Sequence, residues 1–161
     1  MDNPNSKDMQ LALHSFDGQA DISVVVIARN EEKNIERCIQ SILSQSFTAK
    51  TRVEIILVDD GSSDATVDLS RKLSSDIKII NSPCRSISKN RNIGWRTASA
   101  DYIAYIDADC EAEPGWLANL HAEFINNSQQ DQIAAVGGPN RPPRKVSRFY
   151  DALGILSLIH I

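Results

Sequence analysis

Two aspartates separated by one residue directly follow a short apolar run in this chain of 161 residues. Asp107 and Asp109 come after residues 102–106. If the backbone turns after Asp107, both carboxylates can approach one ion, and such hard oxygen ligands suit Mg²⁺ or Mn²⁺, which keep open positions for water and substrate phosphates. The spacing therefore predicts a divalent metal site beside a diphosphate. The alternative, from these residues alone, is that the two aspartates cap the turn that follows.

Polar and acidic side chains also follow two earlier apolar runs. Arg29-Asn30-Glu31 follows the first run, and Asp59-Asp60 follows the second. Ligands of open α/β sheets lie beyond the carboxyl ends of the strands, so these residues are candidates for a binding site. One residue between 59 and 63 is needed to cap the next helix, and a second aspartate could accept a hydrogen bond from a nucleobase or ribose. Carboxylates gathered at one edge repel one another, which favours a bound cation or ligand donors there.

Arg91 lies on the segment that leads into the run at 102–106. Its guanidinium fork can donate two hydrogen bonds at once, to a phosphate or to a base carbonyl. The alternative for this segment is an ordinary solvated helix face.

These residues need a scaffold of alternating strands and helices. Short β-branched runs predict strands at 22–28, 53–58, 77–80, 102–106 and from 133 to 136. Helical spacing of apolar residues predicts helices after Asn30, which is placed to cap the first of them, over 64–73 and 86–98, and after Pro114. Strands that alternate with helices pair in parallel through right-handed crossovers, so we expect a layered α/β fold.

The composition fits one ordinary globular domain, with 42% hydrophobic and 24% charged residues. A net charge of −4 gives no basic excess, so nucleic acid is not expected as the main partner. No stretch reaches the roughly 18 apolar residues of a membrane helix, and no signal-peptide pattern opens the chain. We therefore expect the chain as given to be cytoplasmic. Residues 1–20 are polar and are expected to form a leader that need not be ordered.

Four segments, taken in order, together resemble family 2 glycosyltransferases. They are SVVVIARNE at 23–31, VDDGSSD at 58–64, RNIG at 91–94 and YIAYIDAD at 102–109. The resemblance covers residues 22 to about 138. It implies a nucleotide-sugar-binding fold of the A type, with one Rossmann-like, mostly parallel sheet, helices on both faces, and bound Mg²⁺ or Mn²⁺. It also implies transfer of a sugar from a nucleoside-diphosphate sugar to an acceptor.

The resemblance implies roles for residues after the first two strands. Ile27, Arg29 and Glu31 would lie around the base and ribose, and Asp60 would accept a hydrogen bond from the base. Ile27 stands where the family often has proline or threonine.

The resemblance also implies roles for residues near the later strand. Arg91 would reach the nucleotide from the other side. Asp107 would lie near the ribose and the metal, and Asp109 would be the direct metal ligand, with Ala108 between them in the same nucleotide-sugar-binding motif.

In this sequence, only the residues that would act on the leaving group of the transfer can be identified. Inverting transfer needs a carboxylate to take the acceptor proton while the metal neutralises the departing diphosphate. In the family this base comes after the matched region, so we expect it beyond Ile161. Asp151 is the one late carboxylate, and no spacing makes it the base. Residues 21–161 are therefore expected to be a donor-binding domain, truncated at the C-terminus and incomplete after about 138.

The sequence leaves the acceptor open, whether glycan, lipid or another molecule. It also leaves open a membrane association through a missing C-terminal part, which would bring the longer parent chain to the inner face of a membrane.

Three other classes use parts of the same pattern. A dinucleotide-dependent oxidoreductase needs a Gly-x-Gly-x-x-Gly turn after the first strand, where this chain has Ala28-Arg29-Asn30-Glu31. A phosphoacceptor signalling domain needs an acidic pair at that place. A nucleotide-binding module without activity shares every motif and stays an alternative.

Overall fold

The computed structural model describes residues 20–45, 51–131 and 135–138, in which strands and helices alternate. The elements are β1 (Ile22–Ala28), α1 (Ile35–Leu43), β2 (Val53–Asp59), α2 (Thr66–Leu73), β3 (Lys78–Asn81), α3 (Ile87–Thr97), β4 (Tyr102–Asp107) and α4 (Trp116–Asp131). The chain divides into two compact units, with the boundary after Ala118. The sheet and helices α1 to α3 belong to the first unit, which holds every candidate site residue.

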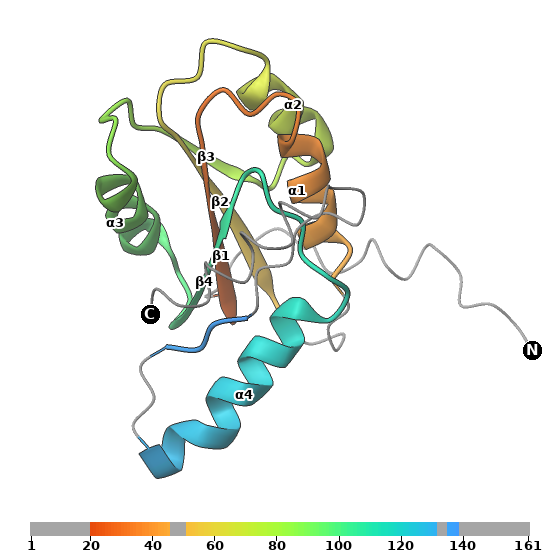
Figure 1. Ribbon diagram of the computed structural model, residues 1–161, viewed down its shortest axis with the longest axis vertical. Coiled ribbons are helices and arrows are strands. Elements are labelled where there is room, and N and C mark those ends of the chain that lie inside the picture. Colours follow the sequence, from red (N-terminus) through yellow and green to blue (C-terminus); the bar gives the residue numbers. More distant parts are fainter. Residues whose placement is uncertain (1–19, 46–50, 132–134, 139–161) are drawn as a thin grey trace, which may run out of the picture. The chain divides into compact units, whose positions relative to one another are not determined.

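The four described strands form one sheet in the order β3-β2-β1-β4, and every pair is parallel. Ile27 on β1 is level with Val58 on β2 and with Asp107 on β4. The carboxyl ends of these strands therefore share one edge, at the top of Figure 1, where the loops that carry the acidic residues lie. The predicted α/β fold with a parallel sheet is confirmed.

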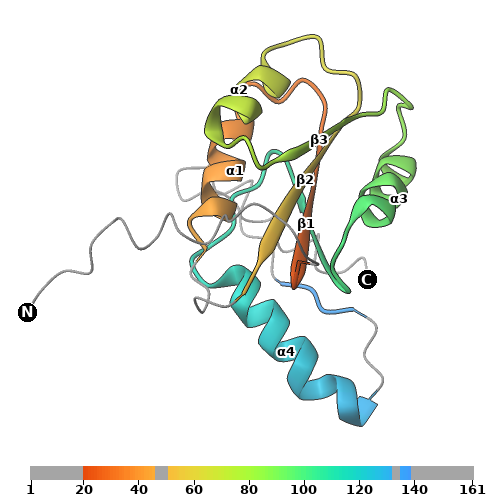
Figure 2. The same cartoon turned by 180° about the vertical axis from the view of Figure 1, so that it is seen from behind.

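Alternate residues of β1 pack on opposite faces of the sheet. Val24 and Val26 belong to a core cluster that includes α1 and α2, whereas Val25 belongs to a smaller cluster on the α3 side. Figures 1 and 2 show α1 and α2 on one side of the strands and α3 on the other. A Cβ at Gly94 would lie 2.3 Å from Val25 Cγ1, so α3 approaches β1 through a glycine. The predicted Rossmann-like arrangement, with helices on both faces, is confirmed.

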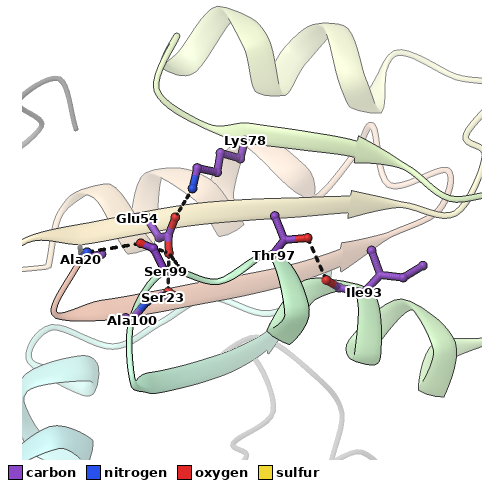
Figure 3. A network of polar contacts seen from close by, with 8 residues as sticks. All are labelled: Ala20, Ser23, Glu54, Lys78, Ile93, Thr97, Ser99 and Ala100. Carbon is purple, nitrogen blue, oxygen red and sulfur yellow. Dashed lines mark hydrogen bonds and ion pairs between the residues drawn. The ribbon is translucent and has the colours of Figure 1, made fainter. Parts of the chain in front are cut away.

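One carboxylate lies inside the sheet, and Figure 3 shows three side chains converging on it. Glu54 on β2 has a side chain only 1% exposed. It accepts hydrogen bonds from Lys78 Nζ at 2.6 Å, from Ser23 Oγ at 2.5 Å, and from Ser99 N and Oγ at 2.5 and 2.7 Å. Burial alone would raise the pKa of Glu54, but these hydrogen bonds outweigh it and lower the pKa to about 2.

Several element boundaries differ from the sequence prediction. The first helix begins at Ile35 with Asn34 at its N-cap, so the prediction that Asn30 caps it is wrong. Helix α2 begins at Thr66, two residues later than expected. The predicted strand at 133–136 falls partly outside the described residues, and Ala135 and Val136 are not in a strand.

Some predictions concern residues that the structure does not describe. Most of the predicted leader (1–19), Asp151 and the apolar segment 152–161 lie outside the described residues. Within the described part of the chain, no helix is long and apolar enough to cross a membrane.

Candidate functional site

The last residue of β4 forms an ion pair with a residue of α3. Arg91 Nη2 lies 3.4 Å from Asp107 Oδ1, and the two side chains are 47% and 61% exposed. The Tyr105 hydroxyl donates to the backbone oxygen of Arg91 at 3.3 Å, which ties the middle of α3 to β4. An ion pair this exposed contributes about 0 to 1 kcal/mol, so either side chain can exchange its partner for a ligand at little energetic cost.

The chain turns immediately after Asp107, as the predicted metal site requires. Cys110 N donates to the backbone oxygen of Asp107 at 2.9 Å, which closes a turn over residues 107–110. Ala108 is buried inside this turn, and Asp109 is exposed. The Cys110 thiol donates to Asp109 Oδ1 at 3.4 Å. Asp107 and Asp109 thus flank one tight turn at the carboxyl edge of the sheet.

The donor set of this turn fits a hard divalent cation that is completed by ligand oxygens. Within the described residues, no group of three or more His, Cys, Asp or Glu side chains surrounds a common metal position. Two exposed carboxylates, Asp107 and Asp109, can supply part of a Mg²⁺ or Mn²⁺ shell, and water and diphosphate oxygens would complete it. The residues present therefore fit the metal that the sequence predicts, on condition that substrate phosphates contribute ligands.

Two thiols lie beside the same turn. The Cys38 thiol donates to the backbone oxygen of Asp107 at 3.6 Å. Burial, followed by the nearby Cys110 and carboxylates, raises the pKa of Cys38 to about 12. Burial and then the hydrogen bond to Asp109 raise the pKa of Cys110 to about 11. Both thiols are protonated at neutral pH and act as packing residues beside the turn.

Asp59, which ends β2, and Asp60, which follows it, both accept hydrogen bonds from loop backbone. Asp60 is 8% exposed, and its Oδ1 accepts a hydrogen bond from Arg85 N at 2.6 Å. Arg85, between β3 and α3, has φ +50°, a left-handed conformation that is uncommon for arginine. Asp59 accepts from Ser62 N at 3.1 Å and closes the turn that follows β2. The side chain of Asp60 therefore holds the β3–α3 loop, and its predicted hydrogen bond to the nucleobase stays a prediction.

Hydrogen bonds join the β1–α1 loop to the β2–α2 loop and to the first residue of α2, and we call them the loop clamp. The backbone N–H groups of Asn30, Glu31 and Glu32 donate to the side chains of Ser62, Thr66 and Asp64 at 2.9, 2.8 and 3.0 Å. In return, Ser63 N donates to Asn30 Oδ1 at 2.8 Å, and Ala65 N donates to Glu32 Oε2 at 3.2 Å. The two loops are fixed to each other from both sides.

The first-strand candidates differ in what surrounds them. Ile27 is half-buried, packs against the core cluster on the α3 side, and is paired with β2 on one side and β4 on the other. Arg29 is exposed. Glu31 Oε2 accepts a hydrogen bond from Asn34 Nδ2 at 2.8 Å. The structure thus brings Arg91 to Asp107 and sets Ile27 level with Asp107, while Asp60 and Glu31 also bond to neighbouring loop or helix residues.

Sequence reasoning missed Glu54 and the loop clamp. A signal for Glu54 was present, because Ser23 and Glu54 are polar residues in otherwise apolar strands, and the structure pairs them in register. For the loop clamp, only the density of Asn, Ser, Thr and Asp after the first two strands was visible. Such residues bond locally to backbone in many arrangements, so their partners could not be assigned.

The parallel sheet with its candidate site at the carboxyl edge is Rossmann-like, and its likeness to solved structures identifies it as a glycosyltransferase fold of the A type. The crystal structure of S. aureus TarS 1–349 matches it with a TM-score of 0.60 and 27% identity, over 76% of this chain and 38% of that chain. TarS 1–349 in complex with UDP-GlcNAc matches with a TM-score of 0.59 and 26% identity, over 76% and 37% of the two chains.

The family model described as Glycosyl transferase family 2 matches residues 23–158, and the chain belongs to this family. A glycosyltransferase of Haemophilus influenzae is 35% identical over 120 residues, which is 72% of this chain and 35% of that protein. Glycosyltransferase AglE of Haloferax volcanii is 30% identical over 100 residues, 60% of this chain and 33% of that protein. The chain thus spans about a third of the length of these relatives.

Proposed function

We propose that the chain is the donor-binding part of a glycosyltransferase that moves a sugar from a nucleoside-diphosphate sugar to an acceptor. One observation carries the proposal. Within the family match at 23–158, the exposed Arg91–Asp107 pair and the turn that presents Asp109 lie together at the carboxyl edge of the sheet. The TarS structures that contain UDP and UDP-GlcNAc support a nucleotide-sugar donor.

The proposed nucleotide site extends along this edge. Asp60 would accept a hydrogen bond from the base, and Arg29, Glu31 and the backbone of Ile27 would lie around the base and ribose. The exposure of Arg29 and the position of Asp60 directly after β2 support these roles.

The proposed diphosphate site lies on β4 and α3. Asp107 and Asp109, with Ala108 buried between them, would hold Mg²⁺ or Mn²⁺. When bound, the metal supplies positive charge that stabilises the departing diphosphate. Arg91, now paired with Asp107, can turn its guanidinium to a phosphate oxygen, because an exposed ion pair exchanges at little cost.

The acceptor half of the reaction is proposed from chemistry alone. Attack of an acceptor hydroxyl on the anomeric carbon, with inversion, needs a carboxylate that takes the hydroxyl proton. We assign this base to residues outside the region described here, and the acceptor to a glycan, lipid or other hydroxyl-bearing molecule. The free cysteines Cys38, Cys84 and Cys110 support a reducing, cytoplasmic location for the donor site.

The loop clamp argues against a dinucleotide-dependent oxidoreductase. Such enzymes bind a pyrophosphate with unoccupied backbone N–H groups at the turn after the first strand. Here the N–H groups of Asn30, Glu31 and Glu32 already donate to side chains of the β2–α2 loop and of the first residue of α2. A pyrophosphate at this turn would have to displace three protein hydrogen bonds.

Calorimetry with UDP, GDP and NAD, each with and without Mn²⁺, tests the proposal. We expect UDP or GDP to bind, with an affinity that rises when Mn²⁺ is present, and NAD not to bind. Tight NAD binding, or no binding of either nucleoside diphosphate, would contradict the proposal. Because the catalytic base is assigned outside the described residues, binding without sugar transfer is the result expected for this chain.

A further inference from the structure

Asn30 has an uncommon backbone conformation at the centre of the loop clamp. Its φ is +55°, in the left-handed region that asparagine tolerates better than most residues. Its backbone N–H donates to Ser62 Oγ at 2.9 Å, and its Oδ1 accepts from Ser63 N at 2.8 Å and from Ser63 Oγ at 3.3 Å. Asn30 therefore bonds in both directions to two consecutive residues of the neighbouring loop.

The position of Asn30 gives these bonds a consequence beyond stability. It lies between Arg29 and Glu31, both candidates for contact with the base and ribose. The loop to which it bonds begins at Asp60, the third candidate, whose backbone N–H donates to Ala28 O at 2.9 Å. The loop clamp thus fixes two parts of the proposed nucleotide site relative to each other.

We propose that Asn30 is a positioning residue for the nucleotide, which acts by bonding the loop that carries Arg29 and Glu31 to the loop that follows Asp60. The inference rests on the proposed function. A loop that is already ordered loses less conformational entropy when a ligand binds, so the clamp raises nucleotide affinity without touching the nucleotide. The acceptor oxygen of Asn30, rather than its left-handed conformation alone, is the feature that matters.

Two substitutions separate the effect of the acceptor oxygen of Asn30 from the effect of its left-handed backbone conformation. Asn30→Gly keeps the left-handed backbone accessible and removes Oδ1, whereas Asn30→Asp keeps an oxygen that can accept from Ser63 N. Ser63→Ala is the matched control, because it removes only the longer Oγ contact and leaves the Ser63 N–H in place. Ser62→Ala, which removes the acceptor of Asn30 N, is a second way to open the clamp if Asn30→Gly does not fold.

The experiment combines UDP calorimetry in Mn²⁺ with amide hydrogen exchange of the full chain without nucleotide. We expect Asn30→Gly, or Ser62→Ala in its place, to lose exchange protection in residues 62–66 and to bind UDP about tenfold more weakly. Asn30→Asp and Ser63→Ala should stay within about threefold of the parent affinity.

Two results would overturn the inference and leave the proposed function intact. One is loss of protection in the Asn30→Gly protein with unchanged UDP affinity, and the other is an Asn30→Asp protein that binds as weakly as Asn30→Gly. If the parent chain itself binds no nucleoside diphosphate, the proposed function fails, and the inference that rests on it fails too.

Discussion

Two carboxylates in the same sheet have opposite surroundings. Glu54, inside β2, has a side chain 1% exposed and lies 2.6 Å from Lys78 Nζ, with further donors from Ser23 and Ser99. Asp107, at the carboxyl end of β4, is 61% exposed and lies 3.4 Å from Arg91 Nη2. Each carboxylate belongs to an ion pair, but only in the pair at the carboxyl edge are both side chains exposed to solvent.

The difference distinguishes a carboxylate that stabilises the fold from one whose surroundings leave it open to a ligand. A buried carboxylate with several donors is costly to disturb, because the donors lose their partner and cannot reach water. An exposed carboxylate with one long ion pair contributes little to stability and can bind a cation instead. The predictions below test this contrast between Glu54 and the carboxyl-edge carboxylates.

The largest effect is expected from removal of the buried carboxylate. Glu54→Ala leaves the hydroxyl of Ser23 and the N–H of Ser99 without their acceptor, and should lower the free energy of unfolding by about 3 kcal/mol. Urea unfolding measures the change. The exposed Glu36 on α1 is the control, and Glu36→Ala should stay within about 0.5 kcal/mol of the parent. Equal losses of unfolding free energy in both variants would contradict the contrast between the buried and the exposed carboxylates.

At the carboxyl edge of the sheet, Asp109→Ala should weaken Mn²⁺-dependent UDP binding about 100-fold. Loss of a direct metal ligand is at least as damaging as loss of a residue that only supports a metal ligand. The matched control is Asp101→Ala, since Asp101 is also exposed but precedes β4 at the other end of the strand. Calorimetry with and without Mn²⁺ gives the measurement. A similar loss in the Asp101 variant would mean that the effect is one of general charge.

A smaller loss is expected when the arginine is changed. Arg91→Ala should weaken UDP binding about tenfold, the size of one charge-assisted hydrogen bond, and leave the unfolding free energy within about 0.5 kcal/mol. Arg91→Lys keeps the positive charge but not the guanidinium fork, so its UDP affinity should fall between that of the parent and that of Arg91→Ala. If Arg91→Ala instead unfolds the protein and leaves the affinity of the folded fraction unchanged, the pair with Asp107 is structural.

The smallest effect is a dependence of stability on pH. The pKa of Glu54 is lowered from 4.5 to about 2 by folding, so its contribution is complete above about pH 4.5 and is lost as pH falls towards 2. The parent should lose about 1 kcal/mol per pH unit in this window relative to Glu54→Gln, which has no carboxylate to protonate. Urea unfolding at pH 7, 4.5 and 3.5 checks it, and parallel losses in both proteins would contradict it.

The parts of the fold that depend on local pattern could be predicted from sequence. The β-branched runs and the apolar stripe from Ile35 to Ile42 correspond to β1, β2, β4 and α1, because burial on the sheet decides both pattern and structure. The turn after Asp107 was likewise anticipated as a condition of the metal site.

The features that could not be predicted depend on contacts between distant residues. Asn30 was expected to cap a helix, but in the structure its side chain accepts from Ser63, which is 33 positions away. Glu54 bonds to Ser99 across 45 positions. Asparagine, serine and glutamate can bond in many ways, and only the folded arrangement of the loops selects one.

The most direct test compares UDP affinity in Mn²⁺ for folded Asp109→Ala and Glu54→Gln proteins, with the unfolding free energy of each measured alongside. The two variants should differ in which property they lose. Asp109→Ala should lose UDP affinity about 100-fold and keep its stability, whereas Glu54→Gln should lose stability and keep its affinity within about twofold. Mn²⁺-dependent UDP binding that persists in Asp109→Ala, or that falls equally in Glu54→Gln, would contradict the account.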